Sequence, residues 1–214
     1  MATLLLRLEG PMQSWGTSSR FTERDTGREP TKSGVIGMIA AALGRPRTSP
    51  IADLTALKMG VRVEREGVIR RDYQTAENVP KANRNSPETS VSNRYYLADA
   101  RFLVGLEGDE VLLKSISNAL QNPVWPIYLG RKAFVPSSPL VIDGLRDEPL
   151  EVALRNHPWL SREGEEVPAR LRLIVECNAN EGVERMDVPL SFSDRMFSPR
   201  FVKSEYLDTP GGTM

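Results

Sequence analysis

The stretch LLLRL at residues 4–8, followed by GPMQSWG at 10–16 and PTKSG at 30–34, decides the organisation of the first half of the chain. The apolar run predicts a buried strand, the glycine-bounded segment predicts a loop, and the third segment opens a helix beside a lysine. Unpaired backbone N–H groups at a helix N-terminus, together with a cation, favour a ligand that carries phosphate. The start of the sequence therefore indicates a site for nucleic acid.

The remainder of residues 1–144 predicts a β-α-β-β-α-β order, which is that of a ferredoxin-like α+β fold shared by many RNA-binding modules. Small residues form a stripe on the first helix at Gly37, Ala40, Ala41 and Gly44, and we expect this stripe to pack close to the sheet. The expected strands cover residues 3–9, 57–65 and 99–106, with a fourth near Ile127 and, after a loop, again at residues 140–142. The expected helices cover residues 33–44 and 109–121.

A polar segment of about thirty residues, 68–97, separates the second and third strands. A connection of this length inside a compact domain is typical of a functional loop, a projecting hairpin or disorder. Arg70, Arg71 and Tyr73 lie at one end of it, and Arg94, Tyr95 and Tyr96 lie at the other. Arginines contact phosphates and tyrosines offer flat surfaces to unstacked bases, so the segment is a candidate for binding single-stranded RNA. The alternative is a solvated hairpin whose aromatic side chains pack into the core.

Charge divides the chain into two parts. The 214 residues carry 28 Lys and Arg and 28 Asp and Glu, a balance that argues against a protein that coats nucleic acid indiscriminately. Residues 1–144 carry 19 basic and 15 acidic side chains, whereas residues 145–214 carry 9 and 13. We therefore expect an RNA-binding domain at 1–144 and a small β-rich lobe at 145–214. The strands of the lobe are expected at residues 170–177, 183–190 and 201–207.

The cysteine content argues against a disulfide or a metal site. Cys177 is alone, so we expect a reducing compartment, no metal and no other cofactor. The longest apolar run, residues 35–43, is too short to span a membrane, and the N-terminus lacks the features of a signal peptide. We expect a cytoplasmic protein with no membrane partner.

Five motifs follow one another along the chain: GPMQSWG (10–16), PTKSGVIGMIAAALG (30–44), RRDYQT (70–75), NRYYLADARFLVGL (93–106) and PIYLGRKAFVPSSPL (126–140). Together they resemble the fifth CRISPR-associated subunit, the CasD type, of the type I-E Cascade surveillance complex. The resemblance is close over about residues 2–142 and general beyond them. It implies a RAMP-superfamily fold (RAMP/RRM-like, ferredoxin-like) with a thumb-like insertion at about 68–97 and a small C-terminal lobe.

The resemblance also implies a role. The subunit would bind and cap the 5′ handle of the CRISPR RNA in a ribonucleoprotein for antiviral defence. Its protein partners would be the large subunit and the backbone subunits of Cascade, and it would meet target DNA only indirectly, through the complex.

Arg94 aligns with the thumb-base arginine of the family motif and is our first choice for RNA contact, with Tyr95 second. In the loop at 128–132, Gly130 permits close backbone approach and two adjacent cations can hold the RNA backbone. The candidate RNA-binding residues are Gln13, Ser14, Trp15, Thr31, Lys32, Ser33, Arg70, Arg71, Tyr73, Arg94, Tyr95, Tyr128, Gly130, Arg131 and Lys132.

Two of these assignments have structural alternatives. Trp15 can equally fill a gap in the core, because a large aromatic side chain next to glycine often does so. Thr31 and Ser33 can simply cap the helix that follows them, an arrangement that remains compatible with a phosphate nearby.

Catalysis is not expected. One branch of the resembled family cleaves precursor CRISPR RNA by attack of a 2′-OH, which benefits from a general base, a general acid and a cation. The single histidine, His157, lies in the acidic part, so we expect it at the surface or in packing, and we assign no catalytic residue. An endoribonuclease that uses Tyr73 or Tyr95 with Lys132 is the alternative. A free-standing RNA-recognition protein ranks last, because the predicted central strands lack the aromatic motifs of that class.

Overall fold

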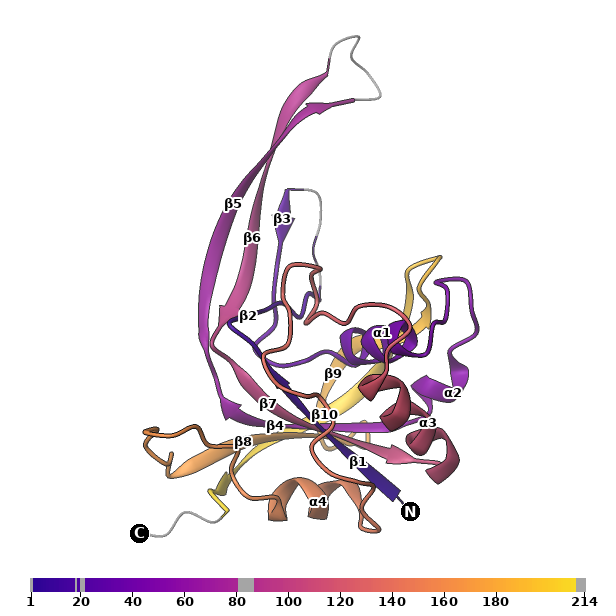
Figure 1. The fold of residues 1–214 in the computed structure, drawn as a ribbon, viewed down its shortest axis with the longest axis vertical. Coiled ribbons are helices and arrows are strands. Elements are labelled where there is room, and N and C mark those ends of the chain that lie inside the picture. Colours follow the sequence, from indigo (N-terminus) through magenta and orange to yellow (C-terminus); the bar gives the residue numbers. More distant parts are fainter. Residues whose placement is uncertain (1, 18, 20–21, 81–86, 211–214) are drawn as a thin grey trace.

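The computed structural model describes residues 2–17, 19, 22–80 and 87–210 and shows a mixed α+β fold. Its centre is a six-stranded antiparallel sheet in the order β1-β7-β4-β8-β10-β9, consistent with a RAMP-like fold (Figure 1). The strands are β1 (Ala2–Glu9), β4 (Lys58–Arg65), β7 (Arg101–Gly108), β8 (Arg170–Cys177), β9 (Val183–Ser191) and β10 (Met196–Asp208). These strands confirm the sequence predictions for 3–9, 57–65, 99–106 and the three C-terminal strands.

Helices cover both faces of the sheet. α1 (Lys32–Ala42), the short α2 (Ala52–Thr55) and α3 (Glu110–Gln121) lie on one side, and α4 (Leu150–Asn156) lies on the other (Figure 1). α3 begins as predicted, because the Asp109 side chain accepts a hydrogen bond from the backbone N–H of Leu112. Among the described residues, no helix is long and apolar enough to cross a membrane.

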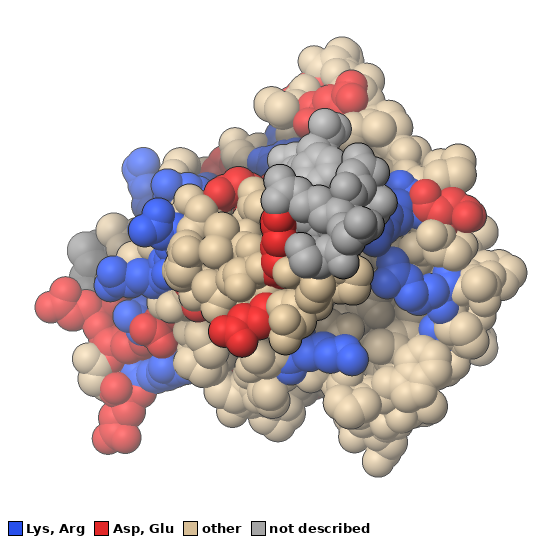
Figure 2. All heavy atoms as spheres, turned by 90° about the horizontal axis from the view of Figure 1, so that it is seen from above, with Lys and Arg blue, Asp and Glu red and all other residues tan. Residues whose placement is uncertain are grey.

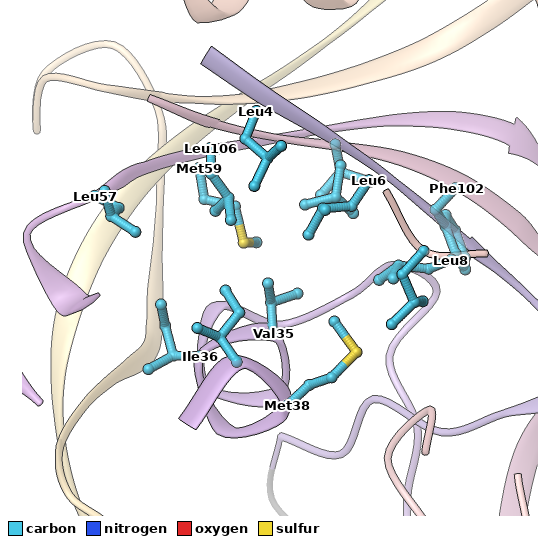
Figure 3. Close-up of a cluster of buried hydrophobic side chains, with 14 of the residues drawn as sticks. Leu4, Leu6, Leu8, Val35, Ile36, Met38, Leu57, Met59, Phe102 and Leu106 are labelled. Carbon is cyan, nitrogen blue, oxygen red and sulfur yellow. The ribbon is translucent and has the colours of Figure 1, made fainter. Parts of the chain in front are cut away.

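The apolar run of β1 is buried on both faces of the sheet. Leu4, Leu6 and Leu8 point toward α1 and belong to the larger core, while Leu5 belongs to the core beneath α4. Successive side chains of a strand point to opposite faces, so a strand that is covered on both sides needs a continuous apolar run. Figure 3 shows the three leucines gathered with buried side chains of α1 and the neighbouring strands.

The prediction that small residues of α1 face the sheet is wrong. Val35, Ile36 and Ile39 of α1 are fully buried in the core, and Ala40 of the stripe is also buried there. The other three stripe residues, Gly37, Ala41 and Gly44, are only half-buried. Burying the larger side chains removes more apolar surface from water, and this difference orients the helix.

The predicted fourth strand is also mostly absent. In the segment 122–149, which is described throughout, the only strand-like contacts are isolated bridges to β1, from Val141 to Leu6 and from Arg146 to Thr3. No strand forms near Ile127. The segment contains five prolines, which have no N–H to donate to a ladder.

The polar insertion is a long antiparallel hairpin of β5 (Val68–Val79) and β6 (Glu88–Ala98) that projects from the sheet (Figure 1). The projecting hairpin was one of the three possibilities that the sequence left open. Two short strands flank β6 at its base: β2 (Met12–Gln13) pairs with it antiparallel and β3 (Glu23–Arg24) pairs with it in parallel.

A buried network of charges ties the C-terminal strands to the start of α1. The backbone N–H of Lys32 donates to Asp187 at 2.8 Å, and its ammonium group lies 3.0 Å from the Glu176 carboxylate. Arg200 donates to both of these carboxylates. β8 also pairs with β4, so strands from both sides of residue 144 share one sheet. The division into domains 1–144 and 145–214 stays a prediction.

Replacing Asp187 by Asn should lower the free energy of unfolding by about 3 kcal/mol, because the change leaves Arg200 buried with only part of its compensating charge. Chemical denaturation of the full chain measures the effect. Glu184→Gln, an exposed change on the same strand, is the matched control and should stay within about 0.5 kcal/mol of the unchanged chain. Equal stability of the two variants would contradict the importance of the network.

Candidate nucleic-acid interface

Three arginines from separate segments meet at the base of the hairpin. Arg24 of β3 pairs in register with Arg94 of β6, which places both side chains on the same face. Arg131, from the loop after α3, donates to the backbone carbonyls of Arg24 at 3.2 Å and Tyr95 at 2.8 Å. Its guanidinium carbon lies 5.5 Å from the centre of the Phe134 ring, a cation–π contact. The arginine cluster, as we call Arg24, Arg94 and Arg131, is thus built by tertiary structure.

The electrostatics of the arginine cluster favour an anion. Burial lowers the pKa of the Arg131 guanidinium, and the positive charges of Arg94 and Arg24 lower it further. Asp72 and Asp25 act in the opposite direction and offset part of this repulsion. Like charges held close together create a positive potential that a phosphate relieves.

Gly130 joins the basic loop at 128–132 to the first loop at 10–16. Its φ is +91°, and a Cβ atom added there would lie 1.8 Å from the Ser14 carbonyl oxygen. The Ser14 N–H donates to the Leu129 carbonyl beside it. The predicted close approach at this glycine is therefore made to the chain's own backbone, and it brings together the two loops that the sequence singled out.

Within the first loop, Gln13 and Trp15 are buried and hydrogen-bonded within the chain. The Trp15 side chain is 1% exposed, and its indole N–H donates to Gln13, whose amide in turn donates to the Leu8 and Ala100 carbonyls. The structure therefore supports the core alternative for Trp15. Ser14 is also buried, with its hydroxyl 3.3 Å from the Tyr95 carbonyl.

At the start of α1, the capping alternative describes what is observed. The Thr31 hydroxyl accepts a hydrogen bond from the Gly34 N–H, and the Ser33 hydroxyl donates to that of Thr31. Lys32 is buried in its ion pair, and the Asp187 carboxylate occupies the place that the sequence offered to a phosphate. The Asp187 carboxylate therefore occupies the N-terminus of α1.

The remaining candidates line the hairpin and the basic loop. Tyr73 is 61% exposed, and Arg70, Arg71 and Lys132 are exposed with no ion pair or hydrogen bond of their side chains in the described part of the chain. Tyr95 and Tyr128 are half-buried. Figure 2, which looks down on the hairpin, shows Lys and Arg side chains bordering a hollow on this face. The side chains of Arg70, Arg71 and Lys132 are therefore available to a ligand.

The two faces of the hairpin carry different candidates. Arg70 lies opposite Tyr96, and Asp72 lies opposite Arg94, so these four residues share the face of the arginine cluster. The other face carries the candidates Arg71, Tyr73 and Tyr95.

Three residues of this interface, Arg24, Tyr96 and Phe134, are not among the candidates chosen from the sequence. Arg24 lies in a polar loop without periodicity, so nothing in the sequence signals its place beside Arg94. Tyr96 and Phe134 pack together with ring centroids 5.8 Å apart, next to Arg131. Tyr96 lies within a quoted motif, but its face of the strand becomes clear only from the pairing register.

His157 lies elsewhere, at the end of α4 on the opposite side of the sheet. It is buried, which lowers the pKa of its imidazole, and its Nδ1 lies 2.7 Å from the Pro158 carbonyl. This is the packing role that the sequence predicted. Within the described ranges, no group of three or more His, Cys, Asp or Glu side chains is placed to hold a metal ion.

Comparisons with known proteins identify the family. The family model described as CRISPR-associated protein (Cas5) matches residues 3–203. The chain belongs to the Cas5 family. The Cascade subunit CasD of Escherichia coli K12, a curated relative, is 34% identical over 170 residues, which cover 72% of this chain and 76% of that protein.

Two solved structures extend the Cas5 similarity over nearly the whole chain. A crystal structure described as a Cas protein is 47% identical, covers 98% of both chains and superposes with a TM-score of 0.80. A chain of a CRISPR RNA-guided surveillance complex is 39% identical, covers 98% of this chain and 91% of that one, and gives a TM-score of 0.85.

Substituting Gly130 by Ala should destabilise this Cas5 protein by about 2 kcal/mol or more, because the added Cβ meets the Ser14 carbonyl and the positive φ disfavours it. A thermal scan should show a fall in Tm of about 4–8 °C. Gly144→Ala is the control, since nothing lies within 4 Å of the Cβ position there. An unchanged Tm for Gly130→Ala would show that the two loops are not held as described.

Proposed function

We propose that this chain is the non-catalytic subunit of a type I-E CRISPR Cascade complex that binds and caps the 5′ handle of the CRISPR RNA. The arginine cluster at the base of the hairpin is the observation that carries the proposal. Membership of the Cas5 family and the similarity to a Cascade subunit and to a chain of an RNA-guided surveillance complex support it.

RNA phosphates would lie against Arg24 and Arg94, with Arg70 and Lys132 extending the positive surface on either side. Arg131 would act mainly by holding the site together, because two of its hydrogen bonds go to backbone carbonyls. On the face of the arginine cluster, the half-buried Tyr96 would offer its ring to an unstacked base, whereas Tyr73 and Tyr95 would do so only for RNA that reaches the other face of the hairpin. Ser14, Thr31 and Ser33 would contribute only to the shape of the neighbouring loops.

The finer description of the fold belongs to the same proposal. Residues 140–146 lie beside β1, where the fourth strand of a ferredoxin-like sheet would pair. The next strands across the sheet from that position are β1, β7 and β4. The β5–β6 hairpin would be the thumb. It would extend the RNA contact and reach the large and backbone subunits, so that target DNA is met only through the assembled complex in the cytoplasm.

The first test concerns phosphate contacts. Arg24→Ala, Arg94→Ala and Lys132→Ala should each lower the affinity of the full chain, or of the complex that contains it, for handle RNA by about tenfold. Each should also reduce the slope of log K against log[salt] by about one, which is the contribution of one phosphate contact. Fluorescence anisotropy over a series of salt concentrations measures both quantities.

Arg170→Ala is the matched control for this test. Arg170 is an exposed cation of β8 whose ion pair within the described residues is with exposed Asp208, and its loss should change neither affinity nor salt dependence. If Arg24→Ala and Arg94→Ala behave like Arg170→Ala, the arginine cluster is not the RNA site. Specific cleavage of precursor RNA in the same mixtures, lost on changing Tyr73, Tyr95 or Lys132, would favour the endoribonuclease instead.

The second test concerns the hairpin. Thr75 and Val91 lie opposite each other, so residues 76–90 can be replaced by a two-residue Asn-Gly turn that closes a shorter hairpin and leaves the arginine cluster intact. The shortened chain should keep its thermal stability but be lost from the complex when it is purified with the RNA and the other subunits. Normal incorporation of the shortened chain would contradict the role of the hairpin as a thumb.

A further inference from the structure

A groove lies beside the arginine cluster, between α1 and the loop that follows α3. It encloses about 320 Å³ and is lined by α1 on one side, by residues 125–128 on the other, and by Phe192 from the turn between β9 and β10. The volume lies at the lower end of the range for small-ligand sites, about 300–1,000 Å³.

The lining is aromatic and positively charged. Trp125, Tyr128 and Phe192 contribute three aromatic side chains, and Trp125 is 42% exposed. Arg45 and Arg47 also line the groove, and no Asp or Glu is among the lining residues. Asp53 compensates Arg45 through two hydrogen bonds, whereas Arg47 donates only to the Phe192 carbonyl, so its charge is left over within the described part of the molecule.

The groove adjoins the candidate RNA interface along the chain. Tyr128 and Gly130 line it, and the next residue, Arg131, belongs to the arginine cluster. A strand of RNA that lies along the cluster therefore has this groove within reach of its next nucleotide. A purely apolar partner segment would gain nothing from the excess positive charge, whereas a nucleotide has both an aromatic base and a phosphate.

We propose that the groove holds one unstacked base of the bound RNA, with the base against the aromatic side chains and its phosphate near Arg47. This inference rests on the proposed function, because it assumes that RNA lies on the arginine cluster. Stacking of this kind tolerates any base, so the groove would fix the path of the RNA more than its sequence.

The test fills the groove and removes the base in turn. Gly37 lies in the lining, and a Cβ added there would be 3.5 Å from the Phe192 ring, an ordinary van der Waals contact. Gly37→Ala is therefore the control. Gly37→Leu, with its larger side chain, is the variant that blocks the groove. Trp125→Ala is a second variant that removes an exposed ring without disturbing the core. Each protein is titrated with handle RNAs that carry a single abasic site at successive positions.

For the unchanged chain and Gly37→Ala, one abasic position should weaken binding by about tenfold or more. Gly37→Leu and Trp125→Ala should bind intact RNA more weakly by a similar factor, and the abasic site at that position should then have no further effect. The salt dependence should be the same as for the unchanged chain, because the variants remove no phosphate contact.

If each abasic site lowers the affinity of Gly37→Leu and Trp125→Ala by the same factor as it does for the unchanged chain, the proposal that the groove holds a base is overturned. Affinity that still depends on Arg24 and Arg94 would leave the proposed function standing in that case. RNA binding that is unaffected by Gly37→Leu, with assembly of the other subunits lost, would assign the groove to a protein segment and also overturn the proposal. Absence of any RNA binding by the unchanged chain or its complex would overturn both.

Discussion

The Arg131 guanidinium joins three parts of the chain that are distant in sequence, because it reaches from the loop after α3 to the backbone carbonyls of β3 and β6. These contacts hold Arg24 and Arg94 side by side at the base of the hairpin despite their like charge. The loop that carries Arg131 is fixed in turn by the close approach of Gly130 to Ser14. A positive site of this kind is stable only because backbone dipoles and packing hold it in place.

The two places that could bind an anion, the N-terminus of α1 and the arginine cluster, differ in how far acidic side chains of the chain neutralise them. The N-terminus of α1 has the N–H groups and the lysine that suit a phosphate, yet Asp187 and Glu176 from the C-terminal strands satisfy both. The same carboxylates join those strands to the first helix. The helix start, for which the sequence predicted a phosphate, therefore stabilises the fold instead. At the arginine cluster, by contrast, the described acids Asp72 and Asp25 offset only part of the positive charge. RNA binding is therefore expected at the hairpin and not at the helix start.

Elements with strong local patterns could be predicted from the sequence, and those that depend on tertiary contacts could not. The strands around residues 57–65 and 170–177 show clear alternation, and α3 has a cap and helical spacing, so all three were predicted correctly. α1 is apolar on most sides, so periodicity could not say which face meets the sheet. α4 has seven residues, too few for a periodic signal, and β3 is a two-residue parallel contact that places Arg24 without any local pattern. In the site, the exposed cations were predictable by residue type, whereas the burial of Trp15 and Lys32 required the packed structure.

Photo-crosslinking of bound RNA locates the surface that contacts it. Handle RNA with photoreactive nucleotides is bound by the full chain or by the complex that contains it, irradiated and digested, and the linked peptides are mapped by mass spectrometry. We expect crosslinks on the face of the arginine cluster, at Tyr96 or at Tyr128 and its neighbours in the basic loop. Crosslinks confined to residues 145–214, with none at the base of the hairpin, would contradict this location of the RNA site.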